Sequence, residues 1–102
     1  MGWTLKNADA LVARLEHRDT DMPWFICSFE PGPAFKAVEQ LFAEQERLID
    51  SEAWDRVERL WARMQSEMTL IADDQPNAKI REFLLRVYGN EAWLRYEPSE
   101  FR

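Results

Sequence analysis

The chain has 102 residues, 46% of them hydrophobic and 13% aromatic, which is enough apolar material for one small domain spanning residues 1–102. Its single cysteine, Cys27, excludes an internal disulfide and is typical of a reducing compartment. The net charge is −6, and the chain has neither a basic cluster nor an apolar run of about 20 residues, which argues against nucleic acid and membrane as partners. We therefore expect a soluble, cytoplasmic protein.

Two strands are predicted ahead of the helical part of the chain. Residues 24–30 have a strong β composition, and residues 10–17 precede them across a polar turn near residues 18–21. Residues 10–17 also fit a helix capped by Asp9, so both interpretations remain open for this segment. Residues 3–6 add a short edge strand.

Two helices are predicted where apolar residues recur at helical spacing, the first over residues 33–49 and the second over residues 51–72. Because the link between them is short, we expect an antiparallel αα-hairpin. Residues 39–58 carry seven acidic and two basic side chains. This acidic hairpin is either a solvated surface or a contact for a basic partner, as in an inhibitor or immunity protein.

The C-terminal part of the chain predicts a β-hairpin, because two alternating runs flank the dipeptide Gly89-Asn90. Residues directly opposite each other across such a turn share a face of the sheet, and faces alternate along each strand. One face is then almost wholly apolar, with Phe83, Leu85, Val87, Ala92, Leu94 and Tyr96. The other face is rich in arginine and aromatic residues, with Leu84, Arg86, Tyr88, Glu91, Trp93 and Arg95.

These elements predict an α+β fold of two layers, with the αα-hairpin on one face of an antiparallel sheet of four to five strands in the order (β)ββ-αα-ββ. The other sheet face has no cover from this chain, which makes a candidate interface of Leu84, Arg86, Tyr88, Trp93 and Arg95. The simplest partner is a second copy in a symmetric homodimer. In the alternative, the arginines stack on the aromatic rings in solvent.

Residue types that serve catalysis are scarce. His17 and Cys27 are the candidates for a base and a nucleophile, but a turn at residues 18–21 places Cys27 opposite Val12, roughly 16 Å from His17. One histidine and one cysteine are too few for a zinc site. The aspartate-containing stretches lack the glycine or the glutamate of a calcium loop, and no glycine-rich phosphate loop is present. We therefore predict no enzyme activity, no cofactor and no metal.

Several segments together resemble a group of small, uncharacterised bacterial proteins. These segments are the strand start Pro23-Trp24, the run Phe29-Glu30-Pro31-Gly32-Pro33-Ala34-Phe35, and the Gly89-Asn90 hairpin. The resemblance implies a common fold and carries no activity, cofactor or site residue.

A protein-interaction module is the predicted function, and its partner is either a second copy or another protein. The alternative is a small-ligand-binding domain with a pocket between sheet and helices, lined by Trp24, Trp54, Trp61 and Met64. At the mouth of the first hairpin, Asp21 and Trp24 are candidates for the rim of a small pocket, although a tryptophan there also serves as a core anchor.

Overall fold

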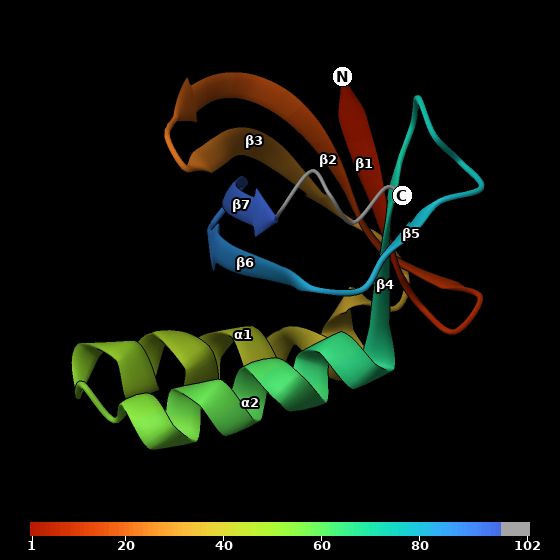
Figure 1. Ribbon diagram of the computed structural model, residues 1–102. Helices are drawn as coiled ribbons and strands as arrows, with labels where there is room; N and C mark the ends of the chain where they lie inside the picture. Colours follow the sequence, from red (N-terminus) through yellow and green to blue (C-terminus); the bar gives the residue numbers. More distant parts are fainter. Residues whose placement is uncertain (97–102) are drawn as a thin grey trace.

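The computed structural model describes residues 1–96, and Figure 1 shows how its elements follow one another. The elements are β1 (Gly2–Asn7), β2 (Ala10–Asp21), β3 (Trp24–Pro31), α1 (Phe35–Asp50), α2 (Trp54–Glu67), β4 (Met68–Ala72), β5 (Lys79–Ile80), β6 (Phe83–Tyr88) and β7 (Glu91–Tyr96). One sheet contains these strands in the order β5-β4-β1-β2-β3-β7-β6, with antiparallel neighbours. The predicted α+β class is confirmed, but the sheet has seven strands in the described residues rather than four to five.

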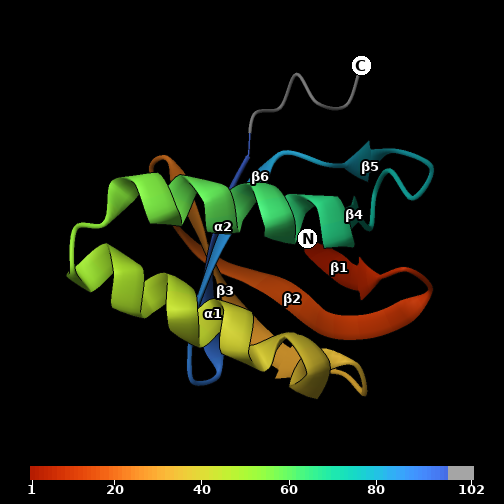
Figure 2. The ribbon, with the colours of Figure 1, turned by 90° about the horizontal axis from the view of Figure 1, so that it is seen from below.

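The sheet curls into a half-barrel whose two edge strands are consecutive in the chain. β5 and β6 lie at opposite ends of the strand order, so residues 81–82 carry the chain from one edge to the other. α1 and α2 run side by side in opposite directions beneath the opening of the half-barrel (Figures 1 and 2). The predicted αα-hairpin is therefore confirmed, and it covers the concave face of the sheet while the convex face points away from it.

The second helix is shorter than predicted. α2 ends at Glu67, and the chain continues at once as β4, in which buried and partly exposed residues alternate. The apolar spacing that leads to Met68 also fits a helix, but the β-branched Thr69 and Ile71 favour a strand. Residues 68–72 form a strand because they pair with β1. Since β1 pairs with β2 on its other side, it lies inside the sheet rather than at the predicted edge.

The first hairpin is longer than predicted, and its turn lies closer to the C-terminus. β2 continues to Asp21 and β3 begins at Trp24, so residues 10–17 form a strand and not a helix. A bulge between His17 and Asp19 shifts the register of this pair of strands. As a result Cys27 lies opposite His17 and not opposite Val12, so the predicted separation of the cysteine and the histidine is wrong.

The C-terminal hairpin has the predicted register. β6 and β7 pair at all six expected positions, from Tyr88 opposite Glu91 to Phe83 opposite Tyr96. Gly89 has a φ of 62° while Asn90 does not have a positive φ, which is the pattern of a type II′ turn with glycine at its first central position. β7 also pairs with β3, so the apolar face of the hairpin joins the concave face of the whole sheet.

The core lies between this concave face and the two helices. As expected, Phe42, Leu60 and Met64 are buried in it. The helical spacing of apolar residues also places Trp54 on the apolar face of the second helix, but its side chain is 52% exposed and lies outside the core. It begins α2 at the turn of the helical hairpin, which extends past the sheet (Figure 1). Within the described residues, neither helix is long and apolar enough to span a bilayer.

Glutamine side chains from both helices cover the outer edge of β6. Gln45 of α1 is fully buried, and its Nε2 donates a hydrogen bond to the carbonyl oxygen of Leu85 at 2.8 Å. Gln65 of α2 donates in the same way to the carbonyl oxygen of Phe83 at 2.9 Å. An uncovered edge strand tends to pair with other chains. These two bonds therefore leave the convex face, and not the edge, as the accessible surface of the hairpin.

Candidate functional site

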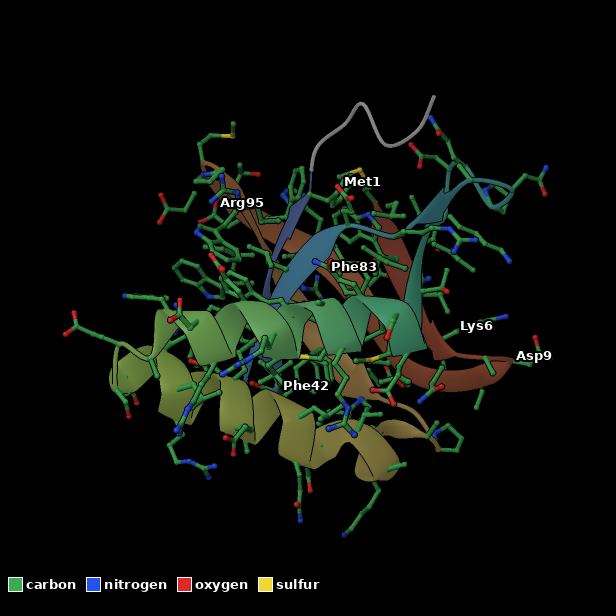
Figure 3. The ribbon with its side chains drawn as sticks, turned by 60° about the horizontal axis from the view of Figure 1, so that its bottom comes forward. Met1, Lys6, Asp9, Phe42, Phe83 and Arg95 are labelled. Carbon is green, nitrogen blue, oxygen red and sulfur yellow. The ribbon has the colours of Figure 1, made fainter. Side chains whose placement is uncertain are left out.

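The convex face of β3, β7 and β6 brings together six of the seven residues that the sequence singled out. β7 lies between β3 and β6, so side chains that were predicted as two separate groups share one surface. We call this surface the outer patch, and it consists of Trp24, Leu84, Arg86, Tyr88, Trp93 and Arg95. Asp21, the seventh residue, lies beside the patch as the cross-strand neighbour of Trp24. Arg95 lies at the end of the sheet opposite Lys6 and Asp9 (Figure 3).

Trp93 is the centre of the aromatic part of the outer patch. Its ring centroid lies 6.2 Å from that of Trp24 and 6.4 Å from that of Tyr88, with the rings inclined to one another. The indole N–H donates to a carboxylate oxygen of Glu91 at 3.0 Å, which fixes the ring on the sheet. These side chains and Arg86 line a hollow of about 400 Å³. The rings thus present rigid apolar surface while the indole N–H is already bonded.

Arg86 is held in place by α1. Its guanidinium forms two hydrogen bonds with the carboxylate of Glu46, at 2.7 and 3.1 Å, and its Cζ lies 5.4 Å from the ring centroid of Tyr88. The bond to Glu46 raises the pKa of Arg86, and burial raises the pKa of Tyr88. The sequence did not point to Glu46, because its role depends on α1 lying beside β6, 40 residues further along the chain.

His17 and Cys27 are neighbours across β2 and β3, but their surroundings do not suit nucleophilic catalysis. Cys27 is fully buried, and burial together with the charge of Glu16 raises the pKa of its thiol to about 11. An activated cysteine needs the opposite shift, since the thiolate is the nucleophile. The His17 ring packs edge-on against Trp3 and Phe25, and its Nε2 lies 2.8 Å from Oγ1 of Thr20.

In the folded protein, Cys27 should react with iodoacetamide at neutral pH at least about 100-fold more slowly than in the unfolded chain. Burial excludes the reagent, and the raised pKa of the thiol keeps the thiolate scarce. The measurement is the alkylation rate by mass spectrometry with and without denaturant, in which Cys27 is the sole cysteine. Equal rates in the two states would show that the thiol is accessible in the native fold.

The residues proposed for a pocket between sheet and helices lie apart from one another. Trp24 belongs to the outer patch, and Met64 is buried in the core. Trp54 lines a hollow at the turn of the helical hairpin, and Trp61 lines another beside Phe83 and Tyr96. These four side chains therefore do not line a common cavity. Between residues 1 and 96, no group of three or more histidine, cysteine, aspartate or glutamate side chains is placed to hold a metal ion.

Comparisons of the chain with models of protein families, with curated proteins and with solved structures find no match. The resemblance to small bacterial proteins and the cytoplasmic location therefore stay predictions.

Proposed function

We propose that the protein is a non-enzymatic protein-interaction module, and that the outer patch is its contact surface. The observation that carries this proposal is the aromatic arrangement around Trp93 with the adjoining arginines Arg86 and Arg95. Tryptophan, tyrosine and arginine supply most of the binding energy at protein interfaces, where they form rigid, largely apolar anchors. Trp93 is partly exposed and Tyr88 is 42% exposed, so both rings can reach a partner.

The polar contacts of the outer patch favour a protein over a small molecule as the ligand. Small-molecule sites orient their ligand with a few convergent polar groups. Here the indole N–H of Trp93 is bonded to Glu91, and Arg86 is bonded to Glu46. What remains for a ligand is mainly ring surface on a convex sheet, which suits another protein surface better than an enclosed compound.

The proposal is tested by photo-crosslinking in cells that make the protein. A photoreactive phenylalanine derivative replaces Tyr88 in one variant and Trp54 in the matched control, since both positions are exposed aromatic residues on different surfaces. We expect discrete adducts from position 88 that disappear when Trp93→Glu is added, because a carboxylate at the centre of the patch opposes apolar contact.

Position 54 also tests the alternative partner surface, because it lies at the turn of the acidic helical hairpin. Adducts from position 54 without adducts from position 88 would contradict the proposal and favour a basic partner bound by the acidic hairpin. Adducts from neither position would also contradict it.

A further inference from the structure

Charged residues flank the outer patch in an ordered way. The strand register places several cross-strand rows on the convex face, and two of them contain the arginines Arg95 and Arg86. From β2 through β3 and β7 to β6, the second of these rows is Asp19, Ile26, Trp93 and Arg86. The first is Asp21, Trp24, Arg95 and Leu84, in which Trp24 and Arg95 continue the register of β3 and β7 by one position beyond Phe25 and Leu94. Each row therefore begins with a carboxylate on β2, crosses apolar surface and carries its arginine on β7 or β6.

Such an ordered face is complementary to itself under one kind of two-fold symmetry. Two sheets that pack face to face keep their strands within about 30° of each other, so the axis runs either along the strands or across them. An axis across the strands would stack β2 on β2 and bring aspartates against aspartates. An axis along the strands, between β3 and β7, reverses the strand order and brings β2 of one copy over β6 of the other.

We infer that the outer patch binds a second copy of this chain in a homodimer whose two-fold axis runs along the strands between β3 and β7. This inference rests on the proposed function and names its partner. In this arrangement Ile26 of each copy packs on the other copy's Trp93, and Asp19 faces the other copy's Arg86. Trp24 stacks on the guanidinium of the other copy's Arg95, a favourable cation–π geometry.

Two further features favour association through this face. The edge of β6 is bonded to Gln45 and Gln65, which prevents pairing of two copies edge to edge at that strand. Within one copy, Asp19 and Arg86 lie at opposite ends of their row with β3 and β7 between them, whereas in the dimer Asp19 of each copy lies opposite Arg86 of the other. The same surface therefore carries both the acidic and the basic side chain of each charge pair across the interface.

A charge exchange between Asp19 and Arg86 tests this geometry. The mass of each variant is measured by light scattering, and the dissociation constant by sedimentation. The wild type should be a dimer at about 100 μM. Asp19→Arg and Arg86→Asp should each weaken the dimer at least about tenfold, because each places like charges across the axis. The double variant should restore the dissociation constant to within about threefold of the wild type, since the charges are again opposite.

Matched controls are Glu58→Arg and Arg81→Glu, exposed charges outside the outer patch, which should leave the dissociation constant unchanged. Trp93→Glu should be a monomer, and a wild-type circular dichroism spectrum would show that its fold is retained. A wild-type monomer at about 100 μM, or a dimer indifferent to Trp93→Glu, would overturn the inference. Failure of the double variant to recover would overturn the position of the axis.

The crosslinking experiment separates this inference from the proposed function. Adducts from position 88 that join two copies of the chain support both. Adducts with a different protein, together with a monomeric wild type, would overturn self-association and leave the interaction module standing.

Discussion

Replacement of Trp3 by alanine should lower the free energy of unfolding by about 3–5 kcal/mol, the range typical of a buried tryptophan. Trp3 is fully buried on the concave face. Its ring centroid lies 5.4 Å from that of Phe25, and its indole N–H donates to the hydroxyl of Tyr96 at 3.1 Å. Because domains of this size are stable by only about 5–15 kcal/mol, the variant should be close to unfolding. The measurement is urea denaturation followed by circular dichroism.

Two other substitutions separate the contributions to the free energy of unfolding that Trp3→Ala removes. Trp54→Ala is the matched control, and it should change the free energy of unfolding by less than about 0.5 kcal/mol because Trp54 is half exposed. Trp3→Phe keeps an aromatic ring but removes the indole N–H, and it should cost more than about 1 kcal/mol, from the hydrogen bond and the smaller ring. Similar losses for Trp3→Ala and Trp54→Ala would mean that the strand β1 does not carry a core residue.

The C-terminal hairpin could be predicted because its signals are local and agree with one another. The turn dipeptide Gly89-Asn90 fixes which residues are opposed, and the alternation on both strands then fixes the faces. Five residues of the outer patch follow from that register alone. Trp24 could not be added to them, because its position depends on the pairing of β3 with β7, about 70 residues apart in the chain.

The missed strands reflect competition between local patterns and tertiary pairing. At Met68 the helical spacing of apolar residues overlaps with the alternation of a strand, and pairing with β1 selects the strand. In the first hairpin, the bulge at residues 17–19 removes the simple two-residue periodicity from which a register is read. The error in the turn carried over directly to the positions of His17 and Cys27, since every opposed pair shifts with the turn.

Gln45 could not be found from the sequence, since a glutamine on a helix is usually exposed. Gln45→Leu should nevertheless lower the free energy of unfolding by about 2–4 kcal/mol. The side chain is fully buried, donates to the carbonyl oxygen of Leu85 and accepts a hydrogen bond from the indole N–H of Trp61, each at 2.8 Å. Leucine has a similar volume, so the main loss is the two unsatisfied polar groups that it leaves inside.

A double-mutant cycle with Trp61→Phe isolates the bond between the two helices. Because Gln45→Leu and Trp61→Phe both remove that bond, their combined cost should fall short of the sum of the single costs by about 1 kcal/mol. Additive costs would indicate that the two side chains stabilise the fold independently.

Gln45→Glu tests the covered edge of β6 by its pH dependence. The new carboxylate can still accept a hydrogen bond from the indole N–H of Trp61. Its second oxygen, however, faces the carbonyl oxygen of Leu85, which also only accepts, and the charge is buried near Glu46. Burial and the neighbouring negative groups raise the pKa of such a carboxyl in the folded state above its unfolded value. The folded state then holds the proton more tightly, so the stability of the variant relative to the wild type should fall as the pH rises from about 5 to about 8.

The loss in Gln45→Leu should stay constant over that range, because leucine does not titrate. A loss in Gln45→Glu that is equally constant would mean that solvent reaches this edge, and that the helices do not seal β6 against another strand.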